Sequence, residues 1–187
     1  LAMLVDDDGV LWIANGQSGS LKMSYGLARF DGKNWTRVKI PEYSGNYFIG
    51  GEIRSMAVDN ENVKWFASYI ASFDGSSWKK FEEPDGPASR YAQSVTVDAR
   101  GRKWFCSTKG VSCYDGKTWT NYTAENGLPG TQAGHAAFDL DGIGWFTLDT
   151  GLHSFDGRAW TSWAESVRIN GDANGDGWVS ICSLTVD

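Results

Sequence analysis

Five similar segments of the chain carry, at one shared position, residue types that could do chemistry. Five segments of the chain end in aspartate, and the residue four places before each aspartate is, in order, Ala2, Ser55, Ser94, His135 and Ser183. A histidine among small hydroxyl groups can act as a general base or bind a ligand, or it can simply bond water and its neighbours. Arg54 and Gln93 precede two of the serines, and Tyr91 lies two places before Gln93. We therefore expect a ligand-binding group made of Arg54, Ser55, Tyr91, Gln93, Ser94 and His135.

A second candidate is an acidic loop near the end of the sequence. Asp172, Asn174 and Asp176 place oxygen donors at positions 1, 3 and 5, a glycine follows, and Trp178 offers its carbonyl at position 7. This spacing matches the first half of an EF-hand-type calcium loop, although the closing acid at position 12 is a serine. The sequence thus predicts calcium as a cofactor. The same stretch also fits a repeat turn, and it resembles the first segment of a dockerin.

Tryptophan is unusually abundant, with ten residues in the chain. Eight of them occupy two positions that recur in every repeat, where an aromatic side chain can bury about 150–250 Å² between neighbouring units. Trp163 and Trp178 fall outside this pattern. We expect these two to be the tryptophans that contact a ligand, for example by stacking on a sugar ring.

Two cysteines flank a predicted hairpin. If Lys109 and Gly110 form its two-residue loop, Cys106 and Cys113 face each other across the two strands. A disulfide is then one interpretation, if the strand geometry suits it. Two buried thiols are the other.

The elements that must position these residues form a repeat. The spacing D-x-x-G-x-x-W begins at Asp6, Asp59, Asp98 and Asp139, with Asn62 in the place of one glycine. Asparagine is the best substitute for glycine in a left-handed turn. An aromatic–Asp–Gly turn and a second tryptophan follow each time. Four short antiparallel strands in a period of about 40 residues are typical of a β-propeller blade.

The repeat count predicts an all-β protein, a single propeller or partial propeller over residues 1–187. Four four-stranded blades fall at about 1–52, 53–91, 92–132 and 133–180, and 181–187 reads as the first strand of a fifth. An open arc of four blades would leave unpaired edges, which proteins avoid. One hypothesis is that two chains form a homodimer that completes one ring. The alternative is a compact monomer in which 181–187 closes onto the first blade.

The repeats also resemble a known family. The stretches from Gly26 to Thr36 and from Phe155 to Thr161 match the Gly-Leu and Phe-Asp-Gly-x-x-Trp-Thr elements of the two-component regulator propeller repeat. In that family the repeats form the extracytoplasmic sensor part of bacterial signalling proteins, and they occur in other secreted proteins too. The resemblance implies a β-propeller in the periplasm or outside the cell. The present sequence departs from the sensor family because it contains no membrane span and no kinase part.

Composition and charge narrow the classes of function. The net charge is −6 with no basic run, which argues against nucleic acid as a partner. No apolar stretch approaches the roughly 20 residues of a membrane-spanning helix. The expected function is an extracytoplasmic ligand-binding or sensor module for a glycan-like or other small ligand. The alternative is a secreted lyase or hydrolase that acts on a polysaccharide or ester with His135 as acid and base. A purely structural domain is a third interpretation.

Overall fold

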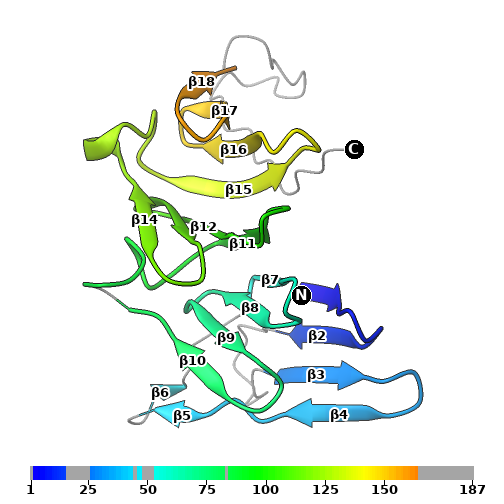
Figure 1. Cartoon of the computed structure of the whole chain (residues 1–187). Coiled ribbons are helices and arrows are strands. Elements are labelled where there is room, and N and C mark those ends of the chain that lie inside the picture. The colour runs from blue at the N-terminus through cyan, green and yellow to red at the C-terminus, as the bar shows by residue number, and fades with distance from the viewer. Residues whose placement is uncertain (1, 16–25, 44–45, 48–52, 83, 164–187) are drawn as a thin grey trace, which may run out of the picture.

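The computed structural model describes residues 2–15, 26–43, 46–47, 53–82 and 84–163. They form four four-stranded antiparallel sheets and one two-stranded ribbon (Figure 1). Blade 1 contains β1 (Ala2–Val5), β2 (Leu11–Asn15), β3 (Gly26–Phe30) and β4 (Trp35–Val38). Blade 2 contains β7 (Ser55–Val58), β8 (Lys64–Ala67), β9 (Ala71–Phe73) and β10 (Trp78–Lys80). Blade 3 contains β11 (Ser94–Val97), β12 (Lys103–Ser107), β13 (Gly110–Tyr114) and β14 (Trp119–Tyr122). Blade 4 contains β15 (Ala133–Phe138), β16 (Gly144–Leu148), β17 (Gly151–Phe155) and β18 (Trp160–Ser162).

Each blade is a simple meander, because its four strands pair in chain order. A short ribbon of β5 (Glu42–Tyr43) and β6 (Asn46–Tyr47) follows blade 1, and a 3-10 turn, η1 (Ala124–Asn126), follows blade 3. The predicted all-β fold with four four-stranded blades is confirmed. The predicted extra strand at 181–187 lies outside the described residues.

The D-x-x-G-x-x-W turns join the first and second strands of each blade. One carboxylate oxygen of each aspartate accepts backbone N–H bonds, and the other accepts the indole N–H of the tryptophan six residues later. The indole bonds measure 2.8 Å for Asp6–Trp12, 2.8 Å for Asp59–Trp65, 2.9 Å for Asp98–Trp104 and 3.1 Å for Asp139–Trp145. We call each pair an Asp–Trp bracket. Asn62 has a φ of 60°, so it adopts the left-handed conformation that its place in the repeat requires.

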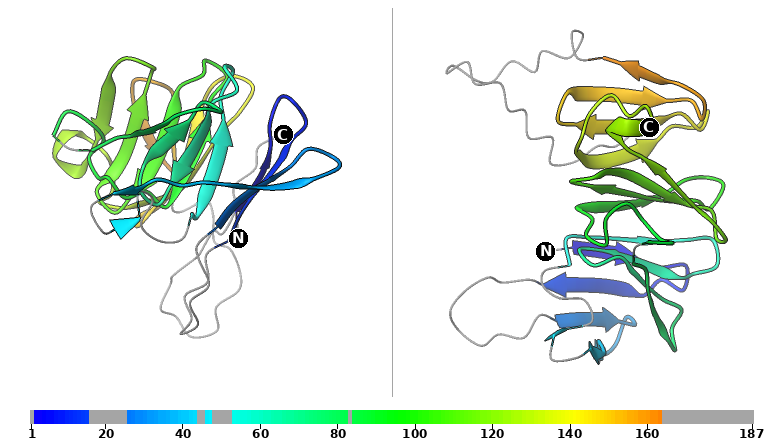
Figure 2. Two further views of the ribbon diagram at one scale, coloured as in Figure 1. Left: turned by 90° about the horizontal axis from the view of Figure 1, so that it is seen from below. Right: turned by 90° about the vertical axis from the view of Figure 1, so that its left-hand side faces the viewer.

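Consecutive blades pack face to face. β1 contacts β7, β7 contacts β11 and β11 contacts β15, so the described blades form an arc (Figures 1 and 2). Within the described residues, β15 and β1 do not pack on each other as consecutive first strands do. We call the side of a blade that points to the next blade its leading face, and the opposite side its trailing face.

The bracket tryptophans lie on the leading faces and hold the blades together. Their edge-to-face partners in the following blade are Phe73 for Trp12, Phe105 for Trp65 and Phe146 for Trp104, at ring distances of 6.1, 6.1 and 5.6 Å. These three tryptophans are at most 4% exposed. Their burial adds to the hydrophobic stabilisation of each of these three interfaces.

The hairpin of blade 3 turns one residue earlier than predicted. Ser107 pairs with Gly110, so the two-residue loop is Thr108–Lys109. Gly110 closes the turn with a φ of 107°, a conformation that suits glycine and fixes the register of the hairpin.

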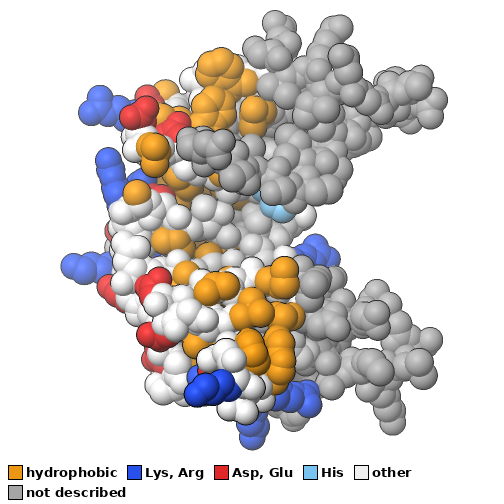
Figure 3. All heavy atoms as spheres, turned by 90° about the vertical axis from the view of Figure 1, so that its right-hand side faces the viewer, with side chains coloured by type: hydrophobic (Ala, Val, Ile, Leu, Met, Phe, Trp, Pro, Cys, Tyr) orange, Lys and Arg blue, Asp and Glu red, His pale blue; other side chains and the backbone are white. Residues whose placement is uncertain are grey.

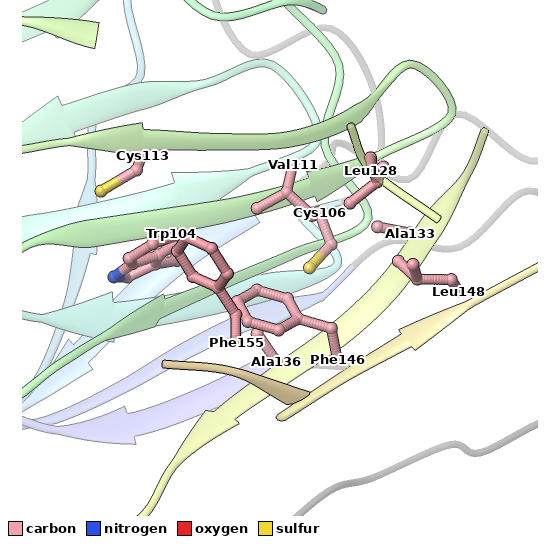
Figure 4. Packing of buried hydrophobic residues seen from close by; sticks show 10 residues of the cluster. All are labelled: Trp104, Cys106, Val111, Cys113, Leu128, Ala133, Ala136, Phe146, Leu148 and Phe155. Carbon is pink, nitrogen blue, oxygen red and sulfur yellow. The ribbon is translucent and has the colours of Figure 1, made fainter. Parts of the chain in front are cut away.

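This register separates the two cysteines. Cys106 lies opposite Val111, and Cys113 lies opposite Trp104. Figure 4 shows the two sulfur atoms apart within the hydrophobic cluster between blades 3 and 4. Both thiols are free, and burial raises the pKa of each to about 12. The disulfide interpretation is therefore wrong, and the interpretation as two buried thiols is confirmed.

Candidate functional site

The described ligand candidates fall at the end of the blades where the first strands begin, which we call the upper face. Because the strands are antiparallel, the hairpins that join second and third strands lie at the same end. A cavity of about 460 Å³ opens there between blades 2 and 3. It is lined by Glu82, Ser89, Arg90, Tyr91, Thr108 and Lys109.

The cavity follows from a local departure from the repeat. The hairpin of blade 2 runs WFASYIASFD, two residues shorter than WFCSTKGVSCYD in blade 3. Ser68 takes up the shorter path with a φ of 115°, which is unusual for a residue other than glycine. Its backbone bonds Ala92 in both directions, at 3.0 and 2.8 Å. Tyr69 is thereby bridged to Tyr91 at the entrance to blade 3.

Two tyrosines form one wall beside the cavity. The rings of Tyr69 and Tyr91 lie 4.3 Å apart, and their hydroxyl oxygens are 2.5 Å apart. This hydrogen bond raises the pKa of Tyr69. Tyr91 is 44% exposed, and the guanidinium of Arg90 lies 5.2 Å from its ring centre. The wall therefore offers an exposed aromatic side chain beside a cation.

Charge is mixed around the cavity. Arg90 and Lys109 contribute cations, and Glu82 contributes a carboxylate that pairs with Lys80. The buried hydroxyl of Ser89 accepts a hydrogen bond from the backbone N–H of Tyr91, which fixes the start of this connection. The cavity therefore brings charged groups, hydrogen-bonding groups and an aromatic ring together in one place.

Ser55 and Ser94 serve the contacts between blades. The hydroxyl of Ser55 accepts a bond from the Val95 N–H at 3.2 Å and donates one to the Val95 carbonyl at 3.4 Å. Ser94 donates to the Gly134 carbonyl at 2.7 Å. Each hydroxyl is thus bonded to the first strand of the next blade, where it spaces neighbouring strands.

His135 occupies an irregular part of β15. The pairing of β15 with β16 shifts register between Ala133 and Ala136, as in a β-bulge, and the His135 N–H donates to the Thr147 hydroxyl at 2.9 Å. The imidazole is half-buried, and desolvation lowers its pKa. It is therefore neutral near pH 7 and able to accept a proton. Among the described residues, no side chain bonds its ring nitrogens.

The remaining sequence candidates are scattered. Arg54 is exposed just before β7, and Gln93 is half-buried with its N–H bonded to the Cys106 carbonyl at 2.7 Å. Trp163 is 38% exposed, lies 5.6 Å from the ring of Trp145 and donates its indole N–H to Ser154 at 2.9 Å. It belongs to blade 4 and does not line the cavity. Of the predicted ligand residues that the structure describes, Tyr91 alone lines it.

The predicted calcium ligands, Asp172, Asn174, Asp176 and Trp178, lie outside the described residues. Among the described residues, no group of three or more His, Cys, Asp or Glu side chains could hold a metal ion.

Tyr69, Glu82, Ser89, Thr108 and Lys109 were not among the sequence candidates. The signal that could have indicated them is the two-residue shortening of the blade 2 hairpin, since a missing pair of residues must be compensated by a neighbouring segment.

No family model and no curated protein matches the chain. Solved structures do. An extracellular domain assigned to a hybrid two-component system of B. thetaiotaomicron is 19% identical with a TM-score of 0.69, over 86% of this chain and 24% of that one. PorZ, a surface component of the type-IX secretion system of Porphyromonas gingivalis, is 19% identical with a TM-score of 0.65, over 82% and 25%. A streptogramin B lyase is 12% identical with a TM-score of 0.63, over 85% and 52%.

These similarities show the fold: the chain is a β-propeller-type repeat protein. It spans about a quarter of the length of the first two proteins and about half of the third. No helix in the described part of the chain is long and apolar enough to cross a bilayer.

Proposed function

We propose that this chain is an extracytoplasmic ligand-binding propeller of the sensor type, and that the cavity between blades 2 and 3 is its ligand site. The cavity itself carries this proposal, because it places the exposed ring of Tyr91 and the guanidinium of Arg90 together, next to the shortened hairpin of blade 2. Connections that carry unusual backbone on a rigid scaffold are where binding residues concentrate. The similarity to extracellular domains of two-component systems supports the same role.

The proposed ligand is a saccharide or another small polar ring compound. One ring face would stack on Tyr91, and its hydroxyl or carboxylate groups would bond Arg90 and the residues opposite. The test is calorimetric titration of the chain with a panel of neutral and uronic-acid disaccharides. Saturable binding that falls at least about tenfold in Arg90→Ala and Tyr91→Ala is the expected result, since one charged bond or one stacked ring contributes about 1.4 kcal/mol or more.

Matched variants separate a ligand contact from a structural effect. Arg100→Ala removes an exposed arginine of a turn at the opposite end of blade 3 and should leave binding unchanged. Tyr91→Phe keeps the ring and removes the bond to Tyr69, so it should bind nearly as well as the parent. No binding across the panel, or binding that survives both alanine variants, contradicts the proposed site.

A hydrolase or lyase is the second candidate, because His135 lies at the irregular pairing of β15 and its half-buried imidazole has a pKa lowered by desolvation. Turnover of a polysaccharide or ester that disappears in His135→Ala would favour it. Binding without turnover favours the sensor.

Calcium binding at Asp172, Asn174, Asp176 and Trp178 and a ligand contact from Trp163 stay predictions from the sequence. The homodimer and the compact monomer stay the two alternatives from the sequence, and light scattering after size exclusion distinguishes them through the solution mass.

A further inference from the structure

Each interface between consecutive blades places one cation against the Asp–Trp bracket of the leading face. Between blades 1 and 2, the Lys64 ammonium lies 2.9 Å from the Asp6 carboxylate and 5.2 Å from the centre of the Trp12 ring. Between blades 2 and 3, Lys103 lies 2.8 Å from Asp59 and 5.1 Å from the Trp65 ring. All four charged side chains are at most 7% exposed. Each lysine stands directly before the tryptophan of its own blade.

At the interface between blades 3 and 4, a cation from a different position pairs with the bracket carboxylate of Asp98. Gly144 stands where the lysine would be, and a Cβ atom there would meet Phe138 at 2.7 Å. The cation comes from the same blade as the aspartate instead. Arg102 lies 2.6 Å from Asp98 and 5.0 Å from the centre of the Trp104 ring. All three interfaces therefore neutralise the bracket, with a lysine from the next blade or an arginine from the same turn.

On the leading face of blade 4, the described residues form the bracket without the cation. Asp139 bonds Trp145, and the position that corresponds to Arg102 is Ile143. Among the described residues, no cation pairs with Asp139 or lies over Trp145. A blade that covered this face would desolvate the carboxylate, which is costly without a partner charge.

We propose that the leading face of blade 4 receives a further β-propeller blade that carries lysine directly before its tryptophan. This proposal concerns assembly and does not depend on the proposed ligand site. The requirement for lysine at this position also decides which blades can bind this face. Blade 1 of a second copy has the apolar surface for the contact, with Met3, Val5 and Trp35 exposed by 60, 60 and 57%. The hydrophobic patch at the lower end of Figure 3 lies at the end of the molecule that blade 1 occupies.

Blade 1 nevertheless lacks the charge. Its residue before Trp12 is Leu11, so a second copy would bury Asp139 without a cation. The unmodified chain should not associate through this face, which is a physical reason to expect no two-chain ring. Replacing Leu11 by lysine gives blade 1 the proposed chemistry.

The experiment compares the full-length chain with Leu11→Lys, Leu11→Met and the double variant Leu11→Lys/Asp139→Asn by sedimentation equilibrium at low and high salt. We expect a monomeric parent, self-association of Leu11→Lys at least about tenfold tighter than that of the parent, and a loss of this gain in the double variant. Salt should weaken the association. Leu11→Met keeps the size of the side chain without the charge and should behave like the parent. Circular dichroism verifies that each variant is folded.

Two outcomes would overturn the proposal. One is a folded Leu11→Lys chain that associates no more than Leu11→Met. The other is a parent chain that already associates as tightly as Leu11→Lys, because the face would then accept a blade without lysine.

Discussion

Removing the Lys103 charge is the sharpest test of how the blades are held together. Lys103→Met keeps most of the aliphatic stem beside Trp65 and leaves the Asp59 carboxylate, which is 2% exposed, without its cation. Deleting one partner of a buried ion pair typically costs about 3–5 kcal/mol. Because Trp65 and the Val63 amide still bond Asp59, we expect the lower end, about 3 kcal/mol in the free energy of unfolding.

Urea unfolding followed by tryptophan fluorescence measures this loss. Lys117→Met removes an exposed lysine of the same blade and should change the free energy of unfolding by less than about 0.5 kcal/mol. Lys103→Met/Asp59→Asn removes both charges, so it should recover at least about 1 kcal/mol relative to Lys103→Met alone. A single-variant loss no larger than that of Lys117→Met, or a double variant whose losses simply add, would refute the ion-pair account.

The pH dependence of the free energy of unfolding tests the Lys103–Asp59 ion pair independently. Burial alone would raise the pKa of Asp59, but hydrogen bonds from Lys103, Trp65 and the Val63 amide lower it below that of an unfolded chain. The carboxylate therefore stabilises the fold above its unfolded pKa of about 3.9, and this stability is lost as the pH falls through the lower folded value. Without Lys103 the pKa of Asp59 rises. The difference in stability between the parent and Lys103→Met should thus shrink as the pH falls below about 5.

Three further predictions concern a tightly packed glycine, a buried histidine and the acidic loop. Gly144→Ala should cost about 1–3 kcal/mol in the free energy of unfolding, because the new Cβ would lie 2.6 Å from Phe146; a neutral result in urea would contradict the packing. Burial lowers the pKa of His153, so the unfolded state takes up its proton first as the pH falls below about 6.5. The free energy of unfolding should therefore fall by up to about 1.4 kcal/mol per pH unit, and His153→Gln should make this slope smaller. If the acidic loop binds calcium, EDTA should lower the melting temperature of the parent but not of Asp172→Ala, and identical melts would remove the calcium prediction.

The repeat pattern predicted the fold because its signals are local. The aspartate and glycine of each turn interact with atoms only a few residues away, so their spacing indicated the four blades before any contact between blades was known. Asn62 illustrates the strength of the signal, since it adopts the left-handed turn conformation in place of glycine. The hairpin register of blade 3 was harder, because it depends on which residue takes the positive φ. The one-residue difference in the turn decided which residues lie opposite Cys106 and Cys113.

The cavity and the lysine pattern were beyond the sequence for a different reason. Tyr69 meets Tyr91, and Lys103 meets Asp59, across elements that only packing brings together. The serines suggested as ligand groups turned out to bond the backbone of the next blade, a partner that no spacing within one repeat can indicate. The sequence by itself thus determined the strands, the D-x-x-G-x-x-W turns and the blade count of the described residues. Only the tertiary structure decided which side chains face one another, because the blades meet through residues about 40 positions apart.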